Sequence, residues 1–369
     1  MNSAASYGGI LAALAERLPL EKLSFRALVE GKYVPLHRWT WAYYLGGLTL
    51  FFFAVQVATG LLLLFYYEPT VSGAHASVEY LTEHVTGGFL IRNLHTWSAS
   101  LMILCLFLHL LTTFAMKAFE RPRELTWLVG VGLLLVAFLF GFTGYLLPWH
   151  KLAVNATKVG LQSIEQVGEL LPAAFSDWPR RIRETLQGEA AVGQATLSRF
   201  YSLHVVVLPL VSFLLIGIHL LGVQLHGLSP GVDEPAKKQI RFFPFFLLHD
   251  FRVWGAAFFI VFVLGLCLPF ESFYSYPLFE PYDPLGSTPD GIKPEWYFYF
   301  LYYPLELLPF WVVQLGVIFL LITLLGAPWI FRGASRRTLR ATAWAAFVYL
   351  FVITVFGGWI YELFRGGEG

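Results

Sequence analysis

Four histidines inside long apolar stretches constrain this chain more than any other feature. His95 and His109 are fourteen residues apart, and His204 and His219 are fifteen apart. An α-helix rises about 1.5 Å and turns about 100° per residue, so each pair returns to nearly the same helix face after about 21 Å. Two such helices side by side place one imidazole pair near each edge of a hydrocarbon core about 30 Å thick. The spacing predicts two stacked haems, each held by two histidines.

A lone histidine in a membrane helix more often hydrogen-bonds a neighbouring helix or belongs to a proton path. The matched spacing favours ligation, with His95 opposite His204 near the outer membrane edge and His109 opposite His219 near the cytoplasmic edge. Two alternatives stay open. One is a proton-coupled transporter, which needs acidic partners at the same depth. The other is a di-haem membrane anchor that feeds a dehydrogenase and has a single quinone site.

Glycines repeat with the same period. Gly46 and Gly60 are fourteen residues apart, as are Gly130 and Gly144. A residue without a side chain lets a flat macrocycle approach the backbone closely. Ordinary packing of small residues between membrane helices is the other explanation. Agreement with the histidine period favours cofactor binding, so we expect these glycines to face the haems.

Composition places the chain in the membrane. Hydrophobic residues make up 57% of the sequence and charged residues 13%, and the net charge of +1 gives no support to nucleic-acid binding. No Cys-x-x-Cys-His motif is present, so any haem is bound without a thioether link. We predict an all-α membrane protein with about seven transmembrane helices, the first four forming a di-haem four-helix bundle. The predicted spans are 41–66, 90–116, 127–147, 201–224, 254–270, 308–331 and 341–361.

Lysine and arginine are unevenly divided between the two sides of these spans. Sixteen fall on the side of the N-terminus and nine on the other, so we expect a cytoplasmic N-terminus in the cell inner membrane. An interfacial amphipathic helix is expected before the first span, because Arg17, Lys22, Arg26 and Lys32 alternate with apolar residues. Two domains are expected: a four-helix di-haem domain over 1–226 and a three-helix domain over 227–369. The apolar segment 298–311 is interpreted as the start of the sixth span.

Several longer motifs resemble the cytochrome b/b6 family of quinol-oxidising Rieske complexes. They are VQVATGLLLLFYYEPTV (55–71), IRNLHTWSAS (91–100), RPRELTW (121–127), GYLLPW (144–149), SRFYSLH (198–204) and PLGSTPDGIKPEWYF (284–298). The first half is similar to cytochrome b6, and the second half to the C-terminal part of respiratory cytochrome b. The segment 242–255 resembles the respiratory cytoplasmic loop.

The resemblance implies the cytochrome b subunit of a quinol:cytochrome c (or other carrier) oxidoreductase that runs a Q cycle. Two non-covalent b-type haems, quinone as substrate, a Rieske iron–sulfur protein, a cytochrome c-type subunit or carrier, lipid and a homodimeric complex are implied with it. Tyr44 stands where the b6 branch has a cysteine, so a covalent third haem is not expected.

For quinol oxidation the resemblance singles out Glu295 of the Pro-Glu-Trp-Tyr box as a proton acceptor, with Tyr145, Tyr297 and Tyr302 around it. A turn or capping role is the simpler explanation of Glu295. Buried tyrosines are common in any apolar interior.

Arg92 and Arg199 lie just before the outer histidines, where haem propionates need cations, although snorkelling to lipid headgroups is equally consistent. For the cytoplasmic quinone site the candidates are Asp250, His226 and His249. Threonines follow His109 where the family often has an arginine, so the inner propionates need another partner.

Overall fold

The computed structural model describes residues 32–37, 39–229, 238–270, 280–286 and 292–365. Over these residues, seven helices are long and apolar enough to cross a membrane, which confirms the predicted all-α membrane fold. The chain is a multi-pass membrane protein. The predicted interfacial helix falls almost entirely within 1–31, outside the described residues.

The glycines and three of the histidines lie on four helices of the first half, and His204 lies in the π-helix that leads into the last of them. The four helices are α3 (Tyr43–Leu63), α5 (Gly88–Ala115), α6 (Glu124–Leu146) and α10 (Leu208–His226). Short 3-10 helix η2 (Thr40–Ala42) leads into α3, while α9 (Gln194–Ser202) and π-helix η4 (Leu203–Val207) run directly into α10. Helix α3 packs along α5 and α6 packs along α10, whereas α5 and α6 touch over little of their length. The four helices therefore form two close pairs with room between them.

The second half contributes three further spans. They are α11 (Leu247–Cys267), which continues from π-helix η5 (Phe242–Phe246), α13 (Phe310–Ile330) and α14 (Arg336–Arg365). The fifth span begins at Phe242 and not at 254, so the segment expected to be a loop is largely helical. Asp250 and Arg252 interrupt the apolar run that marks a span, but backbone hydrogen bonding continues through them.

The segment 298–311 does not start the sixth span as expected. It forms a separate helix, α12 (Tyr299–Leu307), which follows the 3-10 helix η7 (Trp296–Phe298). Leu308 has an extended backbone, and Pro309 caps the start of α13. Proline is favoured at a helix start and disrupts a helix interior, which explains the break.

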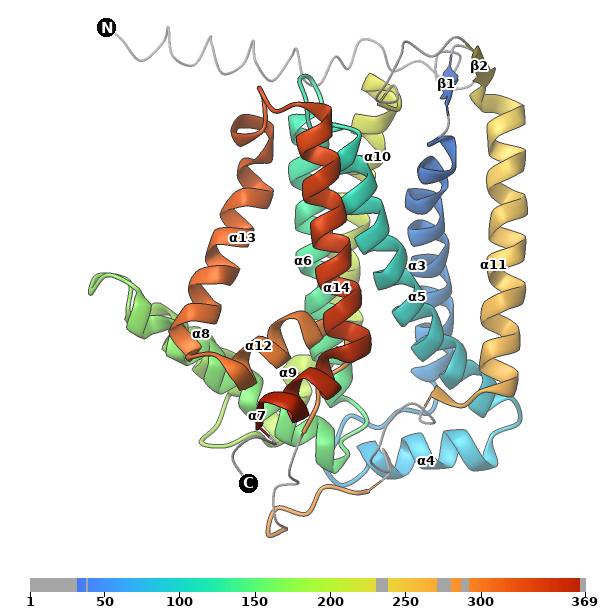
Figure 1. The fold of residues 1–369 in the computed structure, drawn as a ribbon. Helices are drawn as coiled ribbons and strands as arrows, with labels where there is room; N and C mark the ends of the chain where they lie inside the picture. Colours follow the sequence, from blue (N-terminus) through green and yellow to red (C-terminus); the bar gives the residue numbers. More distant parts are fainter. Residues whose placement is uncertain (1–31, 38, 230–237, 271–279, 287–291, 366–369) are drawn as a thin grey trace, which may run out of the picture.

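The two ends of the bundle differ (Figure 1). Strands β1 (Tyr33–Leu36) and β2 (Lys238–Arg241) pair antiparallel at one end, with Tyr33 opposite Arg241. Helices α4 (Ala74–His84), α7 (Lys151–Gln166) and α8 (Asp177–Gln187) and the 3-10 helix η3 (Val167–Leu170) lie at the other end. We call the second end the outer end, following the orientation predicted from the basic residues.

Candidate di-haem and quinone sites

The four intramembrane histidines meet in two pairs, as the spacing predicts. The ring centroids of His95 and His204 are 6.4 Å apart, and those of His109 and His219 are also 6.4 Å apart. Two metal–nitrogen bonds of about 2 Å each, together with two imidazole ring radii, span about this distance. Over the described residues, no three His, Cys, Asp or Glu side chains cluster as a metal site. Opposed pairs of imidazoles suit the two axial positions of a haem iron.

Each histidine of the two pairs faces one of the periodic glycines. A β-carbon placed at these glycines would lie between 2.6 and 3.4 Å from the Cε1 atom of the facing imidazole. The pairs are Gly46 with His109, Gly60 with His95, Gly130 with His219, and Gly144 with His204. A β-carbon therefore requires the ring to shift at Gly144 and to yield slightly at Gly46 and Gly130, whereas at Gly60 it makes an ordinary contact. The glycines make room for the ligands themselves, a closer role than the predicted contact with the macrocycle.

Hydrogen bonds hold three of the four rings through Nδ1. Oγ1 of Thr59 lies 2.9 Å from Nδ1 of His95, and Oγ1 of Thr143 lies 3.2 Å from Nδ1 of His204. Nδ1 of His219 lies 3.0 Å from the carbonyl oxygen of Thr126. Nδ1 of His109 is buried without a partner among the described residues. Such contacts fix ring orientation and leave Nε2 to face the opposite imidazole, as in metal-ligating histidines.

A π-helix explains why the two histidine spacings differ. His204 lies within η4, where the N–H of Leu208 bonds the carbonyl of Leu203. This i to i+5 bond accommodates one residue more than an α-helical turn. The fifteen residues between His204 and His219 therefore advance the helix about as far as the fourteen between His95 and His109. His204 and His219 consequently face the same side of their helix, as His95 and His109 do. In a straight α-helix the one extra residue would turn the second histidine by about 100°.

The inner pair lines a cavity of about 280 Å³ between the two helix pairs. Among the described residues that line it, Arg123, just before α6, carries the one charged side chain. The guanidinium of Arg123 donates to the carbonyl oxygens of His226, at 3.2 Å, and Gly227, at 3.4 Å. Arg123 belongs to the RPRELTW motif, but nothing in the motif itself indicates that this arginine lines the cavity.

At the outer end, Glu295 is surrounded by tyrosines from three elements. Its carboxylate lies within electrostatic range of Tyr145 on α6, Tyr297 on η7 and Tyr299 on α12. The hydroxyl of Tyr145 is buried without a partner among the described residues. The Glu295 side chain makes no capping hydrogen bond at η7, although its backbone is the N-cap. The capping explanation for its side chain is therefore not supported.

The tyrosines of this cluster are held as neutral phenols. Burial raises the pKa of Tyr297 well above its ordinary value, and the negative charge of Glu295 raises it further. Burial, with smaller contributions from Tyr303 and Glu295, raises the pKa of Tyr299 to about 12. Tyr302 lies next to Tyr299, with the two ring centroids 6.4 Å apart. The structure thus joins three of the four predicted outer residues closely and adds Tyr299.

The three inner candidates face different surroundings. The carboxylate of Asp250 packs against α3, where a β-carbon at Gly47 would lie 2.7 Å from Oδ1. His249 donates from Nδ1–H to the carbonyl oxygen of Phe245, 2.9 Å away on its own segment, and is exposed. His226 is the last residue of α10, beside Arg123. Among the three, Asp250 is the one packed directly against α3.

Comparison with known families identifies the chain. Residues 29–227 match the family model described as cytochrome b/b6/petB, and residues 281–362 match cytochrome b(C-terminal)/b6/petD. The chain belongs to the cytochrome b/b6 family. A cytochrome bc complex cytochrome b subunit of Chlorobaculum thiosulfatiphilum is 44% identical over 276 residues, which are 73% of this chain and 61% of that protein. The chain thus spans less than two thirds of that relative's length.

A solved structure supports the same fold. A chain of a hyperthermophilic respiratory complex III aligns with a TM-score of 0.79 and 27% identity, over 94% of this chain and 90% of that chain. Membership of the cytochrome b family implies haem b. The opposed imidazoles and the facing glycines fit such a group. When bound, haem supplies one-electron transfer.

The two predicted propionate arginines of this cytochrome b have different surroundings. Arg92, three residues before His95, acts electrostatically on His150 at the outer end. Arg199 is exposed and donates to the carbonyl oxygens of Glu184, at 3.4 Å, and Thr185 at the end of α8. Contact of either arginine with a propionate stays a prediction.

One polar contact at the inner end was not anticipated. The ammonium group of Lys32, just before β1, donates to the side chain and carbonyl of Gln224 on α10. Burial lowers the pKa of Lys32 to about 8. Gln224 lies five residues after His219, so the contact ties the segment before the first span to the inner end of the haem-binding helix. The contact joins residues 192 positions apart, which sequence periodicity does not connect.

Proposed function

We propose that this cytochrome b is the quinol-oxidising, electron-conducting subunit of a quinol:cytochrome c (or other carrier) oxidoreductase. It oxidises quinol at the outer end, carries electrons between two bis-histidine haems and reduces quinone at the cytoplasmic end. The observation that carries the proposal is the pair of matched imidazole layers in one bundle. A carboxylate lies toward each end of that bundle: Glu295 near Tyr145 on α6, and Asp250 against Gly47 on α3.

At the outer end, Glu295 accepts a proton from quinol. Tyr145 and Tyr297 remain protonated and offer hydroxyl groups that orient the substrate beside the carboxylate. Trp296 fixes the box by donating from Nε1 to Oγ of Ser100 on α5, 3.3 Å away. Because α5 also carries His95, this bond links the position of Glu295 to that of the outer imidazole pair.

Quinol oxidation releases two protons and two electrons, and the electrons follow separate routes. One leaves for a Rieske iron–sulfur partner, because such a cluster needs two cysteines and two histidines together and no three His, Cys, Asp or Glu side chains cluster among the described residues. The other passes inward along the two histidine layers. Moving one charge against a membrane potential costs about 2.3 kcal/mol per 100 mV, so the ligand contacts at Thr59, Thr143 and Thr126 tune a step that must stay reversible.

At the inner end, Asp250 delivers protons to the quinone being reduced. Its carboxylate lies at the level of the inner imidazole pair, because adjacent residues of α3 face the two groups. A partner cytochrome c-type subunit and a dimeric complex complete the proposal. They are supported by the name of the Chlorobaculum relative, a cytochrome bc complex subunit.

The test is Glu295→Gln in the purified complex. Loss of a positioned proton acceptor slows quinol oxidation by about 100-fold, while the reduced-minus-oxidised haem spectra and the haem content stay unchanged. Glu169→Gln, at an exposed position of the outer loop, is the matched control and retains full turnover. Normal turnover of Glu295→Gln removes Glu295 from the mechanism. Absence of two b-type spectra in the parent protein favours the transporter alternative.

A further inference from the structure

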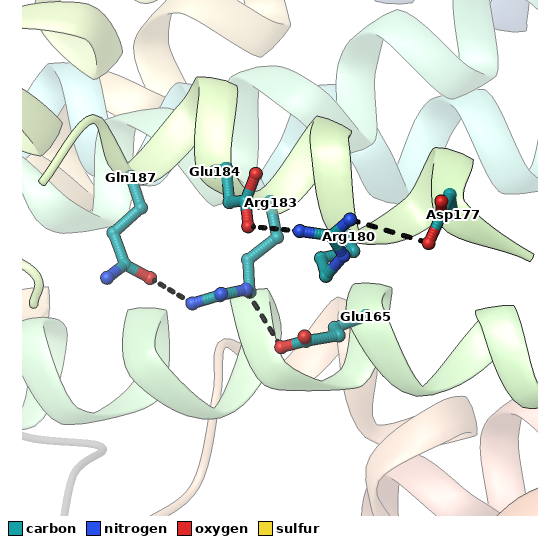
Figure 2. A network of polar contacts seen from close by, with 6 residues as sticks. All are labelled: Glu165, Asp177, Arg180, Arg183, Glu184 and Gln187. Atoms are coloured by element: carbon teal, nitrogen blue, oxygen red, sulfur yellow. Dashed lines mark hydrogen bonds and ion pairs between the residues drawn. The ribbon is translucent and has the colours of Figure 1, made fainter. Parts of the chain in front are cut away.

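Helix α8 has one flank whose charges are already satisfied. Arg180 contacts Glu184 at 2.9 Å and Asp177 at 3.4 Å along the helix, as Figure 2 shows. Arg183 contacts Glu165 of α7 at 2.8 Å and donates to Gln187 at 3.0 Å. This network, together with buried Pro179, fixes how α8 lies on α7. The remaining flank of α8 is therefore held in one defined direction.

That remaining flank is apolar and uncovered. Phe175 is 56% exposed, Trp178 63% and Ile182 48%, and they follow one another at spacings of three and four residues. Such spacing gathers them on one face of the segment. Trp178 and Ile182 border a groove that also includes Arg181, Leu186 and Asp177. Arg181 is exposed and has no hydrogen-bond or ion-pair partner in the described part of the chain.

The position of this flank indicates what covers it. Helix η3, which leads toward α8, contacts the membrane span α13. The hairpin of α7 and α8 projects sideways from the bundle beside the outer ends of α12 and α13 (Figure 1). The outer part of α13 itself exposes Trp311 (56%), Leu315 (49%) and Phe319 (72%), as expected of a surface facing lipid. The hairpin that carries the apolar flank of α8 thus adjoins a lipid-facing span.

We propose that the apolar flank of α8 lies in the membrane interface at the outer end, with Phe175, Trp178 and Ile182 among the upper acyl chains. Tryptophan is enriched at this depth because its ring is apolar and its N–H is polar. Arg181, at the edge of the groove, reaches the phosphate groups of phospholipids, because the one acidic residue of that groove, Asp177, is already paired with Arg180. The occupant is therefore a phospholipid surface, and it anchors the hairpin independently of quinol chemistry.

The test measures depth with nitroxide labels on the assembled complex in phospholipid nanodiscs. Single cysteines are placed at Trp178, Ile182, Arg181 and Arg180 in a Cys105→Ala, Cys267→Ala background. Labels at 178 and 182 are expected to be relaxed more by oxygen than by a water-soluble nickel chelate. The label at 181 gives an intermediate ratio, and the label at 180, on the polar flank, gives the reverse preference.

Two results overturn the proposal. Nickel preference at both 178 and 182 shows that the flank faces water, and exclusion of both reagents shows that a protein subunit covers it. If the Trp178 variant does not assemble, a label at the equally exposed Phe175 replaces it. The measurement of label depth needs no turnover. A result against the membrane position of α8 therefore does not bear on the proposed quinol chemistry, and a failure of the proposed quinol chemistry does not affect the depth measurement.

Discussion

Gly47 and Asp250, 203 positions apart in the chain, are in direct contact: a β-carbon at Gly47 would lie 2.7 Å from Oδ1 of the carboxylate. The preceding residue, Gly46, faces His109 in the same way, at 3.0 Å from Cε1. Two consecutive glycines of α3 thus place an acid group of α11 at the level of the inner imidazole pair. The contact makes the position of Asp250 sensitive to a single methyl group.

Gly47→Ala is therefore expected to displace the Asp250 carboxylate. Reoxidation of the inner haem by quinone slows by about tenfold, equivalent to about 1.4 kcal/mol, while two haems per chain are retained. Stopped-flow absorbance of the inner haem measures it. Gly132→Ala is the control, because its new β-carbon meets only Leu215 at 3.8 Å. Unchanged reoxidation in Gly47→Ala contradicts a proton-delivering role for this carboxylate.

Gly144 leaves the least room of the four glycines that face the histidines. A β-carbon there would lie 2.6 Å from Cε1 of His204, whereas one at Gly60 would lie 3.4 Å from Cε1 of His95. Gly144→Val is expected to displace the His204 ring and lower the haem content from two to one per chain. Gly60→Ala, in the same outer layer, keeps both haems. Pyridine haemochrome assay measures the content, and full occupancy in Gly144→Val would falsify the tight fit.

The π-helix at His204 predicts an asymmetric response to deletions. Removing Val206 converts η4 to regular α-helix and leaves His204 and His219 fourteen residues apart, so both haems are retained. Helix α5 has no π-helical turn that could absorb a deletion. Removing Leu104 therefore rotates His109 by about 100° away from the face it shares with His95, so one haem is lost. The haem content of the two deletion variants tests this prediction. Loss of a haem from the Val206 deletion but not from the Leu104 deletion refutes the explanation.

His150 predicts a pH dependence of stability. Burial, together with the positive charges of Arg92 and His75, lowers its pKa to about 3. The unfolded chain, with an ordinary pKa of 6.5, binds this proton first as the pH falls. The contribution to stability is therefore complete above pH 6.5 and is lost progressively toward pH 3.

His150→Asn removes this titration and keeps the cap on α7, where Nδ1 of His150 now accepts from the N–H of Ala153 at 3.1 Å. Thermal unfolding of the complex at pH 7 and pH 5 measures the effect. The parent loses more stability on acidification than the variant does. Equal losses show that the imidazole is protonated in the folded state as readily as in the unfolded chain.

Much of the bundle could be predicted because its rules are local. The spacing of His95 and His109, and of Gly46 and Gly60, follows from the turn per residue of an α-helix. The predicted number of spans follows from the thickness of the hydrocarbon core. Span boundaries were predicted less well where a charged residue, such as Asp250, interrupts an apolar run. The segment that ends near Pro309 was also assigned to the sixth span, whereas it forms the separate helix α12.

Sequence alone determined that two histidine layers exist and which residues form them, because helical periodicity is encoded within single segments. It also indicated Glu295, through the motif that carries it. Only the tertiary structure decided that Arg123 is the cation of the inner cavity and that Asp250 packs on Gly47. These contacts depend on how separate helices pack. The periodicity of one helix shows which of its faces is apolar, but not which neighbouring helix that face contacts.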